Sequence, residues 1–205
     1  MSTQKKTLFL NGADVYYEED NPDAEKKLLL LHGMSFSSAD WDKIEASRKI
    51  TQWGYGVFEV DYPGFGKSEG NPYYRIERGN YSSGSRFVRD FMLSLKLDHT
   101  VIVGPSMGGG IALQSIIDNQ DLLDAAVLIA PAYGDVERSL SRIERPVLII
   151  WGKRDEVIPI SKGWKLHDLI SGSKLVTVDN AGHALYLEKP DQFFNILKGF
   201  LDDIG

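Results

Sequence analysis

The sequence predicts an α/β protein with a mostly parallel eight-stranded sheet, an antiparallel hairpin at its N-terminus and helices on both faces. Short apolar runs of β-strand type alternate with longer segments whose apolar residues recur every three or four positions. Several of the short runs are apolar at consecutive positions, as strands buried on both faces require. The 205 residues are 42% hydrophobic and 25% charged, which is typical of an ordinary globular domain. We therefore expect one domain over residues 1–205.

The first two expected strands, residues 7–10 and 13–19, form the hairpin. Asn11-Gly12 between them is a pair suited to a tight two-residue turn. Further strands are expected at residues 28–31, 55–60, 101–103, 125–129, 147–151 and 174–178. The helical pattern predicts helices at about 39–53, 84–96, 107–119, 160–170 and 190–203.

The strongest chemical signal is the pentapeptide Gly104-Pro105-Ser106-Met107-Gly108, a G-x-S-x-G pattern between an expected strand and an expected helix. A sharp turn at this point would lift the Ser106 hydroxyl above the edge of the sheet. Small residues on both sides permit the close backbone approach that such a turn needs. The pattern alone would also suit a phosphate-binding turn or simple packing, so a catalytic interpretation needs partner residues.

Two residues further along the chain are the candidate partners of Ser106. A serine hydroxyl is a weak nucleophile unless a histidine takes its proton, and a carboxylate usually orients that histidine. Asp155 and His183 follow the last two expected strands, so all three residues lie at carboxyl strand ends, where open α/β sheets bind ligands. We predict Ser106 as nucleophile, His183 as base and Asp155 as the acid. Asp135, which follows an earlier strand, is the alternative acid.

With these motifs the sequence resembles the α/β-hydrolase family from Leu28 to the C-terminal helix, and it has the family's order of Ser, Asp and His. His32-Gly33 and the segment 61–68, which reads DYPGFGKS, match further landmarks of the family. The resemblance implies an oxyanion hole formed by the backbone N–H groups of Met34 and Met107. A serine at the nucleophile position argues against the dehalogenase and epoxide hydrolase branches, which use aspartate there.

Other polar residues near these motifs are interpreted as structural. We expect His32 to shape the oxyanion turn through side-chain hydrogen bonds, and Asp61 to bond the backbone of its own turn. Asp179 is so near His183 in sequence that we expect it to support the loop rather than the imidazole. His99 and His167 are expected at the surface.

A closer resemblance is to small cap-less members of the family related to the mammalian transcription-factor-interacting factor B. Residues 31–38 and 181–190 carry it. Only about 16 residues separate the expected strands at 125–129 and 147–151, so we expect one short helix there and no cap domain.

The long irregular segment at residues 69–83 is rich in Gly, Asn, Ser and Tyr. Loops of this length are uncommon unless they are functional or mobile. We expect Tyr73, Tyr74 and Tyr81, together with Tyr133, to cover part of the site in place of a cap.

Composition limits the partners. A net charge of −6 disfavours nucleic acid and anionic membranes, and the absence of cysteine excludes disulfides and thiolate chemistry. The four histidines are not clustered as metal ligands and no nucleotide-binding glycine motif occurs, so we expect no metal and no cofactor. The polar N-terminus and short apolar runs predict a cytoplasmic protein. Oligomeric state is left open.

The function expected from these residues is hydrolysis of a small-molecule carboxylic ester through an acyl-enzyme intermediate. Thioesters, lactones, amides and peptides remain alternative substrates. A hypothesis of a different class is a binding or scaffold protein on a hydrolase fold, since a fold alone does not establish function.

Overall fold

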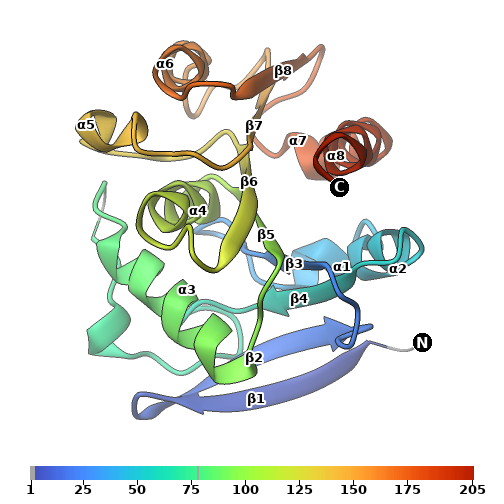
Figure 1. Ribbon diagram of the computed structural model, residues 1–205, viewed down its shortest axis with the longest axis vertical. Coiled ribbons are helices and arrows are strands. Elements are labelled where there is room, and N and C mark those ends of the chain that lie inside the picture. Colours follow the sequence, from blue (N-terminus) through green and yellow to red (C-terminus); the bar gives the residue numbers. More distant parts are fainter. Residues whose placement is uncertain (1–2, 78) are drawn as a thin grey trace.

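The computed structural model describes residues 3–77 and 79–205, and its centre is one eight-stranded sheet (Figure 1). In chain order the strands are β1 (Gln4–Leu10), β2 (Ala13–Asp20), β3 (Lys27–Leu30), β4 (Gly56–Val60), β5 (Thr100–Pro105), β6 (Leu123–Ile129), β7 (Val147–Gly152) and β8 (Lys174–Val178). Their order in the sheet is β1-β2-β4-β3-β5-β6-β7-β8. β1 and β2 pair antiparallel, as do β2 and β4, and the other pairs are parallel. The expected sheet is confirmed.

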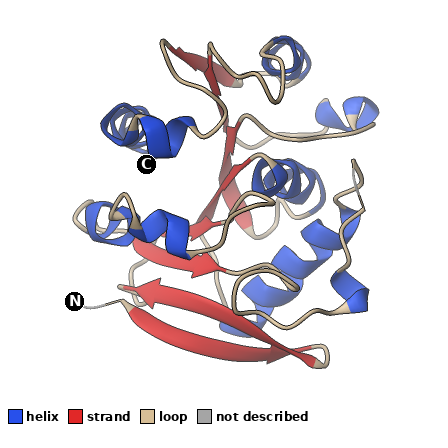
Figure 2. Cartoon of the chain, turned by 180° about the vertical axis from the view of Figure 1, so that it is seen from behind, coloured by secondary structure: helices blue, strands red, loops and turns tan. Residues whose placement is uncertain are grey.

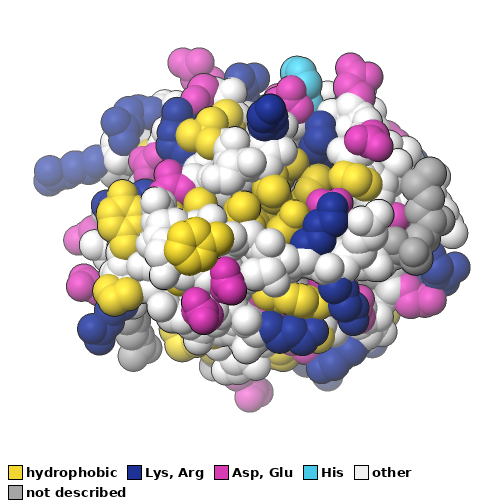
Figure 3. Space-filling model, turned by 90° about the horizontal axis from the view of Figure 1, so that it is seen from below, with side chains coloured by type: hydrophobic (Ala, Val, Ile, Leu, Met, Phe, Trp, Pro, Cys, Tyr) yellow, Lys and Arg dark blue, Asp and Glu magenta, His cyan; other side chains and the backbone are white. Residues whose placement is uncertain are grey.

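The N-terminal hairpin is held by a two-residue turn. Asn11 has φ 48° and Gly12 has φ 93°, the two positive values that match the twist of a hairpin. β1 is an edge strand, and Figure 3 views the molecule from this side, where acidic and basic side chains are interspersed with apolar ones. Lys5 and Lys6 on β1 pair with Glu18 and Glu19 on β2. Charged side chains on an edge strand oppose pairing with another chain.

Helices cover both faces of the sheet (Figure 2). One apolar cluster includes residues of α3 (Ser82–Leu95), α4 (Met107–Asp118), α5 (Glu137–Leu140) and α6 (Ser161–Leu169). The cluster on the opposite face includes residues of α1 (Ala39–Asp42), α2 (Ala46–Thr51), α7 (Leu185–Glu188) and α8 (Pro190–Ile204). None of the helices in the described ranges is long and apolar enough to cross a membrane.

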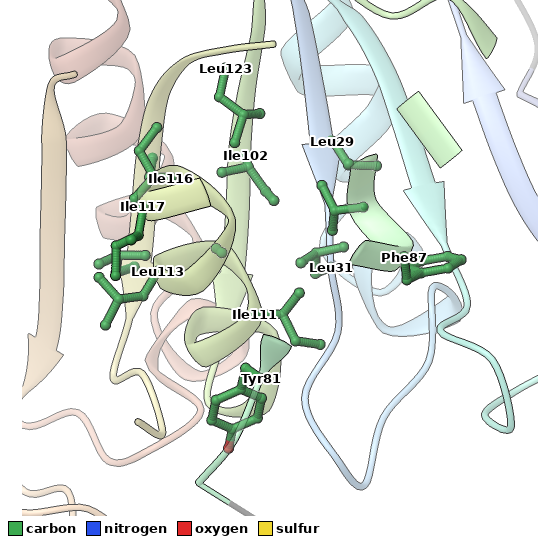
Figure 4. Close-up of a cluster of buried hydrophobic side chains, with 14 of the residues drawn as sticks. Leu29, Leu31, Tyr81, Phe87, Ile102, Ile111, Leu113, Ile116, Ile117 and Leu123 are labelled. Atoms are coloured by element: carbon green, nitrogen blue, oxygen red, sulfur yellow. The ribbon is translucent and has the colours of Figure 1, made fainter. Parts of the chain in front are cut away.

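The continuous apolar runs of the central strands are explained by these two clusters. Leu29 belongs to the first cluster, whereas Leu28 and Leu30 belong to the second, because successive side chains of a strand point to opposite faces. Figure 4 shows the first cluster, with Ile111 of α4 facing Leu31 at the end of β3. The cluster fixes α4, and therefore the turn that precedes it, against the sheet.

One part of the helical pattern differs from expectation. The single helix expected at 39–53 is two helices, because Glu45 adopts φ 55° in the left-handed region and interrupts it. Trp41 on the first helix donates its indole N–H to the Leu31 carbonyl at 3.1 Å, and Ile50 on the second packs into the same face of the sheet. Between β6 and β7 the chain forms only α5, which confirms that there is no cap domain.

Candidate active site

Ser106 lies in a strained turn between β5 and α4. Its φ of 52° and ψ of −115° are unusual for a residue with a side chain, and its carbonyl accepts hydrogen bonds from Gly110 and Ala132. A Cβ atom on Gly104 would lie 2.3 Å from the carbonyl carbon of Gly108, and one on Gly108 would lie 2.6 Å from a backbone oxygen. Both glycines of the pattern are therefore required by close backbone approach, and the turn leaves Ser106 partly exposed.

The His183 imidazole is oriented by a buried carboxylate. Its Nδ1 lies 2.8 Å from Asp155 Oδ2, and the Asp155 side chain is fully buried. The other carboxylate oxygen accepts the backbone N–H groups of Val157 and Ile158, both at 2.9 Å. A carboxylate can only accept, so Nδ1 is the donor and the Nε2 lone pair of the neutral ring is available to take a proton.

The loop that carries His183 is held by backbone contacts with the end of β7. Arg154 N–H donates to the Ala181 carbonyl at 2.9 Å, and a Cβ on Gly152 would lie 2.2 Å from the Gly182 carbonyl oxygen. Gly182 N–H donates to the Glu188 carboxylate at 2.7 Å. These contacts set the imidazole at the same edge of the sheet as Ser106.

In the described part of the chain the Ser106 hydroxyl forms no hydrogen bond with His183. In serine hydrolases, the hydrogen bond between nucleophile and base is often long before substrate binds and tightens in the complex. The structure thus places Ser106 after β5 and His183 after β8, with β6 and β7 between these strands, and the two side chains are not hydrogen-bonded to each other.

The turn after β3 is built around a neutral histidine. Buried His32 donates from Nδ1 to the Gly33 carbonyl at 2.7 Å, and its Nε2 accepts the backbone N–H of Tyr62 at 3.0 Å. Burial lowers the pKa of His32, in agreement with a ring that accepts at one nitrogen. Both nitrogens are used within the fold, so His32 has the structural role expected from the sequence and cannot act as the base.

Asp61 joins this turn to the next one. Its carboxylate accepts the backbone N–H of Ser38 at 2.7 Å and that of Lys67 at 2.8 Å. The sequence predicts the bond within the turn 61–68, and the bond to Ser38 adds a link to the segment that carries Met34. The two segments therefore form one hydrogen-bonded unit beside the Ser106 turn.

An apolar pocket of 470 Å³ opens beside this unit. Met34, which is 54% exposed, and buried Met107 line it together with Phe65 and Ile76. A second pocket, of 620 Å³ and lined by residues such as Tyr133 and Lys162, lies over the ends of β6 and the start of α6.

Comparison with known proteins identifies the family. The model of a family described as serine aminopeptidase, S33 matches residues 22–138, and that of the α/β hydrolase family matches residues 88–192. Over 202 residues the chain is 30% identical to the protein ABHD14A of Mus musculus, which covers 96% of this chain and 80% of that protein. The chain belongs to the α/β-hydrolase family.

Two further relatives agree with this membership. ABHD14B of Rattus norvegicus, whose name gives protein-lysine deacylase as a provisional activity, is 27% identical to this α/β hydrolase. The alignment covers 97% of this chain and 96% of ABHD14B. The crystal structure of a CIB-like hydrolase from Thermoplasma acidophilum has a TM-score of 0.94 and 34% identity, covering 99% of each chain. The resemblance to small ABHD-type hydrolases is confirmed, and membership indicates hydrolysis as the activity.

The alternatives to Asp155 lie elsewhere in this α/β hydrolase. Asp135 is exposed and lines the second pocket, while Asp179 pairs with Lys153 at 2.7 Å. His99 and His167 are exposed. In the ranges 3–77 and 79–205 no three His, Asp or Glu side chains are arranged to hold a metal ion.

The expectation that four tyrosines cover the site is wrong for two of them. Tyr74 is fully buried and Tyr81 is 5% exposed, because both pack in the cluster between α3, α4 and the sheet (Figure 4 shows Tyr81). Tyr133 is partly buried, and its hydroxyl donates to the Lys162 carbonyl at 3.0 Å. Tyr73 is 52% exposed. Instead of forming a lid, the segment lines the apolar pocket through residues between 70 and 76.

Two supporting residues were missed by the sequence analysis. Glu188 binds the backbone next to His183, and Tyr62 connects His32 to the segment 69–83 through a 2.5 Å hydrogen bond from its hydroxyl to the Tyr74 carbonyl. Glu188 lies only five positions after His183, but nothing local shows which backbone group its carboxylate binds. The Tyr62 contacts join segments that only the fold brings together.

Proposed function

We propose that this α/β hydrolase cleaves small carboxylic esters through an acyl-enzyme, with Ser106 as nucleophile, His183 as base and Asp155 as the orienting acid. The observation that carries the proposal is the 2.8 Å hydrogen bond between His183 Nδ1 and the buried Asp155 carboxylate. It leaves Nε2 as the proton acceptor at the edge of the sheet where the strained turn presents the Ser106 hydroxyl.

In the first step, His183 Nε2 takes the hydroxyl proton as Ser106 Oγ attacks the ester carbonyl carbon. The carbonyl oxygen gains the electron pair, and the backbone N–H groups of Met34 and Met107 hydrogen-bond this oxyanion. In the described ranges neither N–H donates to a backbone carbonyl, which leaves both for a ligand. Loss of one oxyanion donor typically costs about 3 kcal/mol of transition-state stabilisation.

The carbon–oxygen bond to the leaving alcohol then breaks, and His183 returns the proton to the alcohol oxygen. A water molecule gives a proton to the same nitrogen and attacks the acyl-enzyme. The second tetrahedral intermediate collapses to release the carboxylic acid and restore the Ser106 hydroxyl.

The test compares hydrolysis of short and medium p-nitrophenyl esters by the wild-type protein and by Ser106→Ala, purified in parallel. We expect the substitution to lower kcat by at least about 10⁴-fold, since the nucleophile is lost while the fold is kept. Circular dichroism of both proteins is the control for folding. Equal rates would overturn the proposal and favour a binding or scaffold role.

Amide substrates are the second candidate, favoured by the deacylase name of the ABHD14B relative and by the aminopeptidase family model. The same mechanism applies, with His183 protonating an amine instead of an alcohol. Acyl-lysine peptides, thioesters and lactones assayed beside the esters, each with Ser106→Ala as the blank, identify the preferred leaving group from the ratio of kcat/KM values.

A further inference from the structure

The apolar pocket and the second pocket lie on opposite sides of β5, the strand that leads into Ser106. The apolar pocket is formed by segments that follow β3 and β4, and by Met107. His183 follows β8, which lies on the other side of β5 in the sheet. Because His183 must protonate the leaving group, the leaving group lies toward β8. The acyl substituent therefore points away from His183, toward the apolar pocket.

One cation stands among the apolar side chains of this pocket. Arg75 lines it and is exposed, and none of the carboxylates in the described ranges lies within 4.0 Å of its guanidinium. By contrast, other basic residues of the chain, such as Lys27 and Arg89, pair with aspartates. The protein as a whole carries a charge of −6, so its overall electrostatic field does not attract anions. A preference for an anionic substrate therefore needs a positively charged group in the pocket itself.

The backbone beneath Arg75 is tied to the core. Tyr74, its neighbour, is fully buried, and the Tyr74 hydroxyl donates to Asp90 at 2.7 Å. The Tyr74 carbonyl accepts the Tyr62 hydroxyl, and the Asn71 side chain donates to the Asn11 carbonyl at 3.0 Å. Because the backbone that carries Arg75 is already fixed, less conformational entropy is lost when its guanidinium binds a ligand.

We propose that the apolar pocket binds the acyl chain of the substrate and that Arg75 selects chains that end in a carboxylate. The substrate class is then a monoester of an aliphatic dicarboxylic acid: the methylene groups contact Met34, Met107, Phe65 and Ile76, and the free carboxylate receives the forked N–H donors of Arg75. The inference rests on the proposed function for the chemistry, and it adds the identity of the acyl group.

The experiment measures kcat/KM for mono-p-nitrophenyl adipate and pimelate, each beside its neutral primary-amide analogue of the same length. Shorter diacids are avoided because their free carboxylate attacks the ester, and buffer rates are subtracted. The variants are Arg75→Gln, Arg75→Lys as the conservative substitution, and Lys26→Gln as a matched control. Lys26 is exposed just before β3, at the end of that strand opposite to the site, and its loss changes the net charge equally.

We expect the wild type to prefer the anionic ester, and Arg75→Gln to lower the ratio of anionic to neutral kcat/KM by about tenfold or more. Arg75→Gln should lower kcat/KM for the amide-terminated ester much less than for the anionic ester. Arg75→Lys should restore part of the preference, and Lys26→Gln should leave it intact. A wild type with no preference, or an equal loss in Lys26→Gln, would overturn the inference.

Binding without turnover separates this inference from the proposed function. Calorimetric titration of Ser106→Ala with pimelate monoamide, whose free carboxylate ends the chain, should show binding that Arg75→Gln in the same background weakens about tenfold. If Ser106 proves dispensable for hydrolysis but this difference is observed, the proposed function fails and the pocket assignment stands. If hydrolysis depends on Ser106 but Arg75 affects neither rate nor binding, the pocket assignment fails alone.

Discussion

The His183 side of the site and the pocket side are built in different ways. At the ends of β7 and β8 the fully buried Asp155 carboxylate is held by two backbone N–H groups and by His183. On the pocket side Met34 and Arg75 are exposed, and only the backbone beneath them is tied to the core. From this difference we expect the proposed proton transfer to depend on fixed side-chain geometry, and the proposed selectivity to depend on exposed side chains that can change without loss of the fold.

The largest effect is expected from Asp155→Asn. The asparagine oxygen can still accept the N–H groups of Val157 and Ile158, but its NH₂ group would face His183 and force the proton onto Nε2. The kcat for ester hydrolysis should fall by about 10⁴-fold with little loss of stability. Steady-state kinetics and thermal unfolding measure the two quantities. Asp135→Asn is the control and should leave kcat unchanged. An equal loss of kcat in Asp135→Asn would contradict the assignment of Asp155 as the acid that orients His183.

A loss of stability is expected from Asp61→Ala on the pocket side. The substitution removes a buried carboxylate and leaves the N–H groups of Ser38 and Lys67 without their partner. We expect the free energy of unfolding to fall by about 2–4 kcal/mol, measured by urea unfolding. Asp179→Ala is the comparison, since its exposed ion pair with Lys153 is worth less than about 1 kcal/mol. Similar losses for both variants would show that the unit formed by the two turns is not tied by Asp61.

A pH-dependent effect is expected at Glu59 on β4, the strand that leads into the pocket segments. Burial and the nearby Asp42 raise the pKa of Glu59 to about 8, and its Oε2 has no hydrogen-bond partner in the described ranges. An acid with a raised pKa in the folded state gives stability that is complete below the unfolded value of 4.5 and is lost as pH rises toward 8.

Glu59→Gln should therefore reduce the loss of stability between pH 5.5 and pH 8.5. At most about 1.4 kcal/mol per pH unit is available from one such group. Urea unfolding of both proteins across this range measures the slope. If the substitution leaves the pH dependence unchanged, Glu59 is not the group that titrates.

The parts of the fold that could be predicted from sequence are those with a contiguous signal. Asn11-Gly12 predicted the hairpin turn, and the apolar runs predicted each strand to within a few residues. The helix expected at 39–53 was not predicted correctly, because Glu45 adopts a left-handed conformation that separates two helices. Helical periodicity indicates only that one face is apolar and does not report the backbone conformation of a single residue.

The sequence by itself predicted a hydrolase and the three residues proposed for its chemistry. Ser106, Asp155 and His183 each lie in a short motif that follows a strand, and parallel strands bring their carboxyl ends to one edge of the sheet. Only the tertiary structure decided which tyrosines are buried, which acid meets the imidazole, and that Arg75 stands in an apolar pocket beside Met34. These features depend on the relative placement of segments far apart in the chain, and that placement is set by packing and not by local pattern.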